Sequence, residues 1–454
     1  MKVLWLCNIM LPVVAEHLGL EASNKEGWLS GLSSVILERK KNNDIELAVA
    51  FPVGENQDGY EEIISVGGSP LHCYGFYEDT RHPENYDVAL EARLLRITEA
   101  FEPDVIHCYG TEYPHTLAMC KAYPHKERIL ISIQGLVSVY ANTYFANLDE
   151  KTVASKTFRD WLKQDSLVQQ QEKFAARGQL EVLSVKLAGN VTGRTAWDKH
   201  YTGEWHPGVR YFHMNETLRS NFYGENPEEL WNPDTCERHS IFLSQGNYPI
   251  KGLHYMLLAL PEIRKVYPDV KVYVAGDDIV SYKSWKDAIK ISAYGRYLRR
   301  IIKENSLEKQ VVFLGRLNAE QMKKAYLQAG LFVCPSTIEN SPNSLGEAMI
   351  LGVPCVSADV GGITSMFVDG QDGILYRGFR TAQNSFDNVC DEKKSSEEQL
   401  KKNVESLKNA VLAMWSDEMQ MRRYSDNARK HAKITHNPEG NYRKMVEIYA
   451  EISS

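Results

Sequence analysis

Two glutamates eight positions apart, Glu339 and Glu347, are the residues in this sequence best suited to chemistry. A Ser/Pro/Asn/Gly segment separates them, and Pro342 prevents a helix from starting earlier. Ser344 with Glu347 three residues later predicts a capping box at a helix N-terminus. The peptide N–H groups of residues 341–345 would then face an anion. Two carboxylates beside such a helix end can bind a molecule that is both hydroxyl-rich and anionic, such as a sugar nucleotide.

The roles in this segment follow from the chemistry of each group. Glu347 would accept hydrogen bonds from ribose hydroxyls, and Glu339 would contact the sugar ring. The peptide groups and helix dipole would face the diphosphate. The candidate donor-binding residues here are Glu347, Ser341, Asn343, Ser344 and Leu345. The structural alternatives stay open, with Glu347 only as half of a capping box and Glu339 as a solvated loop acid.

A second loop, residues 244–252 (SQGNYPIKG), follows a strand-like apolar run. It contains a glycine turn and places Lys251 directly before a helix-like stretch. A cation there could stabilise negative charge on a departing diphosphate. A solvated charge at a helix end is the structural alternative for Lys251.

Short apolar runs alternate with helical patterns through the whole chain. This alternation predicts parallel sheets covered by helices on both faces. The polar, proline-containing stretch at residues 223–239 predicts a domain boundary. We therefore expect two doubly wound Rossmann-like domains, residues 1–225 and 236–436, facing across a cleft. A last helix within residues 437–454 should cross back to complete the first domain. Ligands should bind beyond the carboxyl ends of the strands.

Composition excludes several classes of protein. At 454 residues, with 43% hydrophobic and 24% charged residues, the chain is an ordinary globular protein of more than one domain. A net charge of −7 argues against a generic nucleic-acid binder. Eight scattered cysteines without a C-x-x-C pair favour reduced thiols and a cytoplasmic location. Residues 2–7 predict a first buried strand in preference to a signal peptide, and no apolar run is long enough to span a membrane.

The ordered motif after residue 334 resembles that of the retaining glycosyltransferases of family four, which have the GT-B fold. The matching residues are Pro335, Ser336, Glu339, Glu347, Ala348, Met349, Gly352, Pro354, Gly361, Gly362 and Ile363. The resemblance implies that Lys251 contacts the donor diphosphate and that Glu339 and Lys251 are catalytic. It also adds Gly315 and Arg316, from the run FLGRL, to the donor site.

One position departs from the family pattern. Relatives usually have an arginine five residues before the lysine, where this chain has Gly246. The positively charged residues that bind the donor diphosphate, here called the diphosphate clamp, must then include another cation. Arg316 and Arg194, the latter from the run VTGRTAWD, are the candidates.

The acceptor or sugar side is expected in the first domain. Gly27 should mark a turn after the first strand, and Glu112 could bind an acceptor hydroxyl. Gln134 stands where relatives often have a histidine that contacts the sugar, and Arg194 lies on the same side. No metal-ligand constellation is evident in the sequence, and neither a metal nor a cofactor is expected apart from a nucleoside diphosphate sugar as co-substrate.

The resemblance implies transfer of a sugar to a glycan or lipid-linked acceptor with retained configuration, in cell-surface polysaccharide biosynthesis. The base would be uridine or guanosine, and no nucleic acid partner is expected. A cytoplasmic protein, at most peripheral to the inner face of the membrane, fits this role. The alternatives are a catalytically silent GT-B partner subunit and a sugar-nucleotide epimerase. An NAD-dependent dehydrogenase is disfavoured because the G-x-G-x-x-G fingerprint is missing.

Overall fold

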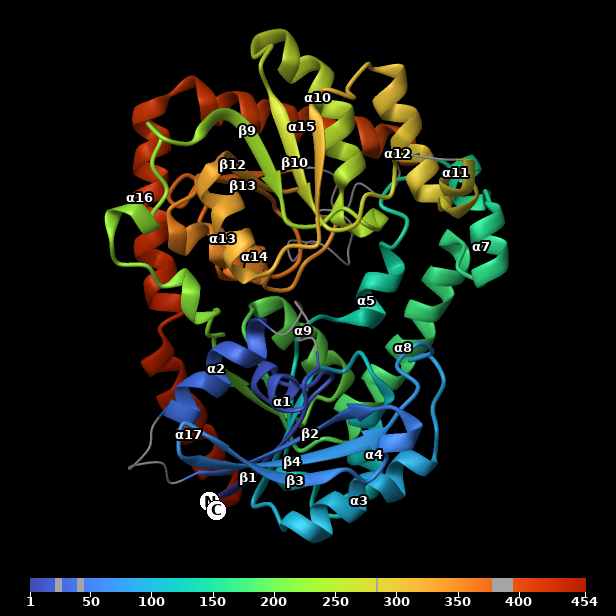
Figure 1. Cartoon of the computed structure of the whole chain (residues 1–454), viewed down its shortest axis with the longest axis vertical. Helices are drawn as coiled ribbons and strands as arrows, with labels where there is room; N and C mark the ends of the chain where they lie inside the picture. The colour runs from blue at the N-terminus through green and yellow to red at the C-terminus, as the bar shows by residue number, and fades with distance from the viewer. Residues whose placement is uncertain (21–26, 39–44, 283–284, 378–394) are drawn as a thin grey trace. The chain divides into compact units, whose positions relative to one another are not determined.

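A computed structural model describes residues 1–20, 27–38, 45–282, 285–377 and 395–454 (Figure 1). The chain divides into two compact units. Unit 1 comprises Met1–Val139, Lys173–Arg219 and Thr435–Ser454, and unit 2 comprises Tyr140–Glu172 and Ser220–Ile434. Each unit is an α/β fold around one sheet. Among the described helices, none is long and apolar enough to cross a bilayer.

Unit 1 contains an eight-stranded sheet that is parallel except for one edge strand. In spatial order its strands are β3 (Glu61–Val66), β4 (Ser69–Tyr77), β2 (Glu46–Val53), β1 (Lys2–Leu6), β5 (Val105–Tyr109), β6 (Ile129–Ser132), β7 (Asn190–Gly193) and β8 (Arg210–His213). The central strands β1, β5 and β6 are almost entirely buried, as their continuous apolar sequences require. The order of strands along the chain reverses between β1 and β5.

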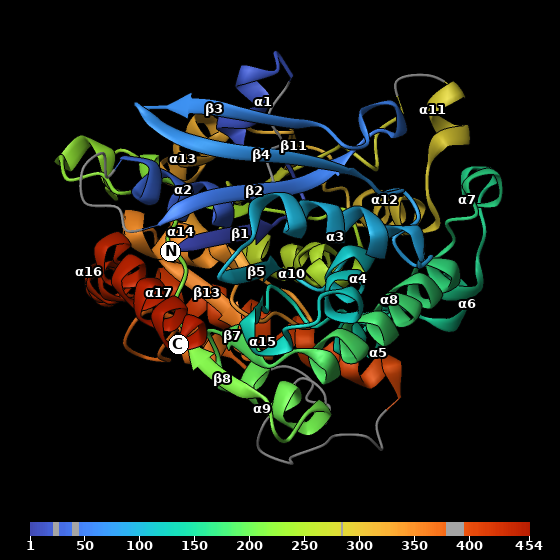
Figure 2. The same cartoon turned by 90° about the horizontal axis from the view of Figure 1, so that it is seen from below.

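The helices of unit 1 are α1 (Pro12–His17), α2 (Gly27–Glu38), α3 (Ala89–Phe101), α4 (Pro114–Ala122), α9 (Ala196–Trp205) and α17 (Pro438–Ser453). The division between the units falls within α5 (Val137–Asn142) and α8 (Leu167–Leu187). Helix α17 packs against α2 and β5, beside the N-terminal strand (Figure 2). Its Tyr449 hydroxyl accepts a hydrogen bond from Nε1 of Trp5 at 2.9 Å. The last helix therefore completes the first unit, as the sequence predicts.

Unit 2 contains a fully parallel six-stranded sheet. Its spatial order is β11 (Val311–Gly315), β10 (Lys271–Ala275), β9 (Glu237–Leu243), β12 (Ala329–Cys334), β13 (Cys355–Ala358) and β14 (Ile374–Tyr376). Numbered within the unit, this is the doubly wound order 3-2-1-4-5-6. The order reverses between β9 and β12, so ligands are expected beyond the carboxyl ends of these two strands.

The helices of unit 2 are α6 (Glu150–Ala154), α7 (Phe158–Lys163), α10 (Leu253–Val266), α11 (Trp285–Lys290), α12 (Ala293–Glu304), α13 (Ala319–Gln328), α14 (Asn343–Leu351), α15 (Ser396–Ser416) and α16 (Glu418–Thr435). Helix α10 follows β9 and packs along α15. Helix α14 follows β12. The two loops that precede α10 and α14 therefore lie at the reversal point of this sheet.

The structure differs from the predicted domain division in one segment. Tyr140–Glu172 lies within the predicted first domain, but it packs with unit 2. Long-range hydrogen bonds explain this placement. The buried carbonyl of Ala146 accepts hydrogen bonds from His254 Nε2 and the Tyr255 hydroxyl, both at 2.8 Å. Such bonds join residues over a hundred positions apart, so no local pattern in the sequence reveals them.

Candidate functional site

An ion pair spans the reversal point of the unit 2 sheet. Lys251 ends the short 3₁₀ helix η5 (Pro249–Lys251) after β9, and Glu339 lies in the loop after β12. Lys251 Nζ lies 2.5 Å from Oε1 of Glu339. The Ser336 hydroxyl donates to the same oxygen at 2.8 Å. The structure thus brings together the two residues that the sequence assigns to catalysis.

The ion pair keeps a positive charge in a largely enclosed position. Burial disfavours the charge on Lys251, but attraction to Glu339 outweighs it and raises the pKa of Lys251 above its ordinary value. The Lys251 side chain is 19% exposed and that of Glu339 is 8% exposed. A partly exposed lysine in this environment remains a cation that can meet an anionic group. Among the described residues, both side-chain contacts of Glu339 use Oε1, so Oε2 is the oxygen that can face a ligand.

Glycines let the loops of this site approach one another closely. A Cβ atom at Gly252 would lie 1.9 Å from the carbonyl oxygen of Pro335. Gly361 has a φ of +56°, and a Cβ atom there would lie 2.0 Å from the carbonyl oxygen of Glu339. The next residue, Gly362, donates its N–H to that same carbonyl at 2.9 Å. These contacts hold the backbone of Glu339 in place, and they require glycine at positions 252 and 361.

The start of α14 differs from the prediction. The helix begins at Asn343 after Pro342, and no side chain caps it. The predicted capping box of Ser344 and Glu347 is therefore wrong, because the helix starts two residues earlier than predicted and its third position is Leu345, not Glu347. Glu347 is 5% exposed, and its Oε2 lies 3.3 Å from the Tyr326 hydroxyl. Glu347 does not cap the helix, so the alternative in which it serves only as half of a capping box loses its main support.

The peptide N–H groups predicted to face the donor diphosphate are only partly available to a ligand. The N–H of Leu345 donates to the carbonyl of Pro342 at 3.0 Å, so it belongs to the first helical turn and not to a ligand. The Ser341 hydroxyl points to the sulfur of Met366 at 3.4 Å. In contrast, Oδ1 of Asn343 is buried without a hydrogen-bond partner among the described residues. A buried acceptor without a partner is costly, and a ligand hydroxyl at this helix start would satisfy it.

Unit 2 has Gly246 where relatives usually have an arginine, and Arg316 is the candidate in this unit to replace it. A Cβ atom at Gly246 would lie 2.7 Å from a methyl group of Leu253 and 3.0 Å from Val274, so any side chain there must displace the packed core. Arg316 follows Gly315 at the end of β11, two strands from the reversal point. It makes a bidentate ion pair with Asp277, at 2.9 Å and 2.8 Å, and is 77% exposed. Its hydrogen bond lowers the pKa of Asp277.

A cavity of about 430 Å³ adjoins the same loop within unit 2. Ser336, Thr337, Asn147, Tyr255 and Asn403 are among the residues that line it. Asn147 Oδ1 accepts hydrogen bonds from the Tyr255 hydroxyl at 2.7 Å and from Asn403 Nδ2 at 2.9 Å. The described residues around this cavity include no lysine or arginine. The lining therefore suits a neutral, hydroxyl-rich group better than a diphosphate.

In unit 1, Arg194 organises a loop of the protein itself. It is 7% exposed and forms an ion pair with Glu216. Its Nη2 donates to the carbonyl of Ile133 at 3.1 Å and to Oε1 of Gln134 at 3.1 Å. The structure therefore brings Arg194 and Gln134 together, but it uses the Arg194 charge internally. Arg194 is no longer a good candidate for the diphosphate clamp.

Glu112 is held by a chain of hydrogen bonds that the sequence analysis missed. Asn8 Nδ2 donates to Oε2 of Glu112 at 3.0 Å, and Asn8 Oδ1 lies 3.0 Å from Nε2 of His115. Nδ1 of His115 lies 2.7 Å from the buried Glu78 carboxylate. Because the Asn8 amide donates to a carboxylate, its oxygen must accept from His115. Asn8 and Glu78 both lie just after strands, a position that marks ligand-facing residues in parallel sheets.

Glu181 is a second residue that the sequence analysis missed. It is fully buried in α8, and its carboxylate receives the Thr111 hydroxyl at 2.7 Å and the N–H groups of Val137 and Ser138 at 3.1 and 2.8 Å. Burial raises the pKa of Glu181 to about 7. This carboxylate therefore caps the start of α5, directly after the Gln134 loop. A glutamate within a long helix otherwise resembles a solvated surface residue.

The remaining predicted site residue is Gly27. The structure places it at the first position of α2, so it begins a helix. Residues 24–26, which precede it in the predicted phosphate-side turn, lie outside the described part of the chain.

Comparisons with known proteins agree with this geometry. Residues 230–398 match the family described as "Glycosyl transferases group 1". An uncharacterized glycosyltransferase, MJ1607 of Methanocaldococcus jannaschii, is 29% identical over 138 residues, 30% of this chain and 31% of that protein. The lipopolysaccharide 1,2-N-acetylglucosaminetransferase of Salmonella typhimurium is 26% identical over 155 residues, 33% of this chain and 39% of that protein. The matched segments thus span about a third of these relatives.

The fold extends over the whole chain. Sucrose-phosphate synthase from Thermosynechococcus elongatus aligns with a TM-score of 0.67 at 13% identity, covering 100% of this chain and 99% of that one. At this identity the likeness shows the fold, which is the pair of Rossmann-like units of GT-B glycosyltransferases. The segment that matches the family model, residues 230–398, thus contains the Lys251–Glu339 pair and α14.

Proposed function

We propose that this protein is a retaining glycosyltransferase that moves a sugar from a nucleoside diphosphate sugar to a glycan or lipid-linked acceptor. The observation that carries this proposal is the Lys251–Glu339 pair at the reversal point of the unit 2 sheet. Glu347 and the unpartnered Oδ1 of Asn343 lie on the adjoining helix. A cation, two carboxylates and a helix start in one loop pair suit the phosphates and hydroxyls of such a donor.

Each residue has a distinct proposed role. Lys251 stabilises the negative charge that grows on the diphosphate as its bond to the sugar breaks. Glu347 binds the ribose hydroxyls. Glu339 positions the sugar through Oε2 and stabilises the positive charge that develops on its ring. Glu347 is committed to the ribose, so the two-carboxylate scheme of glycosidases does not apply here.

Retention of configuration follows from a front-face reaction. The acceptor oxygen bonds to the anomeric carbon on the face from which the diphosphate departs, and a diphosphate oxygen takes the acceptor proton. Lys251 and the α14 N-terminus supply the charge stabilisation that a divalent metal would otherwise provide, so we propose a metal-independent reaction.

The acceptor would bind on unit 1. There, Asn8 holds Glu112, and Arg194 holds the Gln134 loop. Glu112 would bind an acceptor hydroxyl. A relative named for lipopolysaccharide synthesis supports a glycan or lipid-linked acceptor and a role in cell-surface polysaccharide biosynthesis.

A thermal-shift panel of nucleotides and sugar nucleotides tests the donor site. A uridine or guanosine diphosphate should raise the melting temperature of the protein, because a ligand that binds only the folded state stabilises it by mass action. The Lys251→Ala variant should lose most of this shift. The matched control is Lys309→Ala, at an exposed lysine of unit 2. A flat response of the wild type to the whole panel would argue against a donor site.

Release of nucleoside diphosphate with an acceptor separates transfer from the alternative of a silent partner subunit. That alternative has an observation in its favour, since Arg194 and Arg316 are both engaged with carboxylates and Gly246 has no side chain. Nucleotide binding without diphosphate release for any donor and acceptor would favour the silent subunit. Release that requires an acceptor, with or without EDTA, supports metal-independent transfer.

A further inference from the structure

Helix α7 of unit 2 exposes three large apolar side chains. Phe158 is 57% exposed, Trp161 is 62% exposed and Leu162 is 64% exposed. They lie within a helix of six residues, Phe158–Lys163. The Phe158 and Trp161 rings contact each other, with centroids 5.9 Å apart. Single exposed apolar residues are ordinary, but three adjacent ones that include two aromatic rings mark an interaction site.

The apolar surface continues onto a neighbouring helix. Helix α11 packs against α7, and it exposes Ala288 and Ile289, the latter by 39%. These five residues form one apolar patch, named here the α7 patch.

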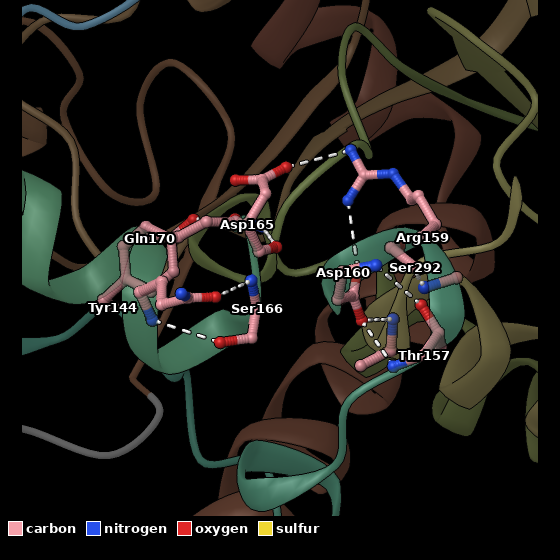
Figure 3. Close-up of polar contacts among 11 residues, drawn as sticks. Tyr144, Thr157, Arg159, Asp160, Asp165, Ser166, Gln170 and Ser292 are labelled. Atoms are coloured by element: carbon pink, nitrogen blue, oxygen red, sulfur yellow. Dashed lines mark hydrogen bonds and ion pairs between the residues drawn. The ribbon is translucent and has the colours of Figure 1, made fainter. Parts of the chain in front are cut away.

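Buried polar contacts hold α7 rigidly, as Figure 3 shows. Thr157 and Asp160 form a capping box at its start. Asp160 is 1% exposed, and its Oδ2 also accepts the N–H of Ala293 at 2.9 Å. Arg159 bridges Asp160 at 3.0 Å and Asp165 at 2.9 Å. A six-residue helix would not be stable alone. Here, its polar face is bonded to unit 2, which leaves the apolar side chains directed to solvent.

Lysines surround the α7 patch. Lys156 lies just before α7, Lys163 ends α7 and Lys290 ends α11; all three are exposed. The acids of these segments are Asp160, which is buried, Asp165, which is paired to Arg159, and Asp287 of α11, which is half-buried. In a chain with a net charge of −7, an apolar centre with a basic rim is a local reversal of charge. This arrangement is complementary to an anionic surface with an apolar interior, which is the surface of a bilayer.

The size of the α7 patch argues against a stable protein partner. Three large apolar side chains exposed by about 60% offer on the order of 350 Å² of surface. A stable protein interface needs about 800 Å² from each partner. Tryptophan and phenylalanine inserted into the headgroup region, with lysines reaching lipid phosphates, need no larger area.

We propose that the α7 patch docks the protein on an anionic bilayer. Phe158, Trp161 and Leu162 enter the boundary between headgroups and acyl chains, while Lys156, Lys163 and Lys290 contact lipid phosphates. The purpose of this docking rests on the proposed function, because it brings the enzyme to a lipid-linked acceptor. The binding itself needs neither donor nor catalysis.

Flotation with phosphatidylcholine vesicles, with and without phosphatidylglycerol, tests this proposal on the full chain. The wild type should float with the anionic vesicles, and high salt should weaken the binding. A triple variant, Phe158→Ser, Trp161→Ser and Leu162→Ser, should bind about tenfold or more weakly. The charge variant Lys156→Glu with Lys163→Glu should lose binding to anionic vesicles selectively. Unchanged far-UV circular dichroism would show that each variant folds.

Matched controls isolate the α7 patch. Val266→Ser and Ile434→Ser remove apolar residues of unit 2 that are 56% and 78% exposed, and they should leave vesicle binding intact. The proposal would be overturned if the wild-type protein bound neither vesicle type, or if the triple variant floated with the vesicles as the wild type does. A wild-type dimer that becomes monomeric in the triple variant would instead assign the patch to self-association. Diphosphate release with a soluble acceptor, measured without vesicles, reports on the proposed transfer separately.

Discussion

The carboxyl edges of the two parallel sheets carry polar groups arranged in different ways. In unit 2, Lys251 and Glu339 form a largely enclosed ion pair, and Asn343 keeps a buried oxygen without a partner among the described residues. In unit 1, the charges are used internally, as Arg194 pairs with Glu216 and His115 lies between Glu78 and Asn8. Both edges have the position that parallel sheets give to ligands.

The difference indicates what each edge can bind. An edge with a charged pair and unsatisfied polar atoms gains stability when an anionic, hydroxyl-rich ligand arrives. An edge whose cation is almost fully buried and bonded within the protein, as Arg194 is, offers shape and single hydrogen bonds, which suits a neutral acceptor. The proposed division of labour, with the donor on unit 2 and the acceptor on unit 1, therefore follows from electrostatics as well as from the position of the motif.

The largest effect is expected from Glu339→Gln. This change keeps the size of the side chain but removes the charge that holds Lys251 and stabilises the reacting sugar, so kcat should fall by about 10²–10⁴-fold. Glu112→Gln, on the unit 1 edge, should mainly raise the KM for the acceptor. Steady-state kinetics of both variants, with Glu308→Gln at an exposed unit 2 glutamate as control, measure the contrast. Equal kcat in Glu339→Gln and wild type would contradict the assignment of Glu339.

Arg194→Ala should act on stability more than on donor binding. It removes the ion-pair partner of the largely buried Glu216 carboxylate and the bonds that hold the Gln134 loop. Breaking a buried pair in this way should lower the free energy of unfolding by about 3–5 kcal/mol. Urea unfolding measures this loss, while the thermal shift caused by the nucleotide should persist. A variant of normal stability that no longer responds to nucleotide would show that Arg194 binds phosphate after all.

Glu181 should make the stability of unit 1 depend on pH. Its pKa is raised from 4.5 to about 7, so the folded protein holds an extra proton between these values. The resulting stabilisation is complete below about pH 4.5 and is lost as the pH rises to about 7, a change of about 3 kcal/mol. Glu181→Gln should remove this slope in chemical unfolding measured across that range. Glu172→Gln, exposed on the same helix, should retain it, and a slope that survives in Glu181→Gln would assign the effect elsewhere.

Local patterns in the sequence predict the elements of this molecule better than its long-range contacts. The alternation of strands and helices predicts the two units, and the structure places Lys251 and Gly361 against Glu339, three of the residues predicted for the site or its motif. The prediction of Ser344 as the helix cap is wrong by two residues, a shift at a helix start that the pattern of residue types does not resolve.

Contacts between distant residues cannot be predicted from local sequence patterns, for a different reason. The role of Arg194 depends on Ile133 and Gln134, and that of His115 on Asn8 and Glu78. Each of these side chains is ordinary in its own segment. Only the parallel arrangement of the strands, which brings the carboxyl ends of β4, β1 and β5, and those of β6 and β7, to one edge of the sheet, gives it a function.

The bond between Trp5 and Tyr449 has a consequence for synthesis of the chain on the ribosome. It joins residues 444 positions apart, so α17 packs against elements that are synthesised long before it. Proteins usually complete their N-terminal domain first as they are made. Here the segments of unit 2 are all synthesised by Ile434, before α17 exists, so unit 2 can finish folding while unit 1 still lacks its final helix. The core around β1 therefore closes only after unit 2 and α17 have been synthesised.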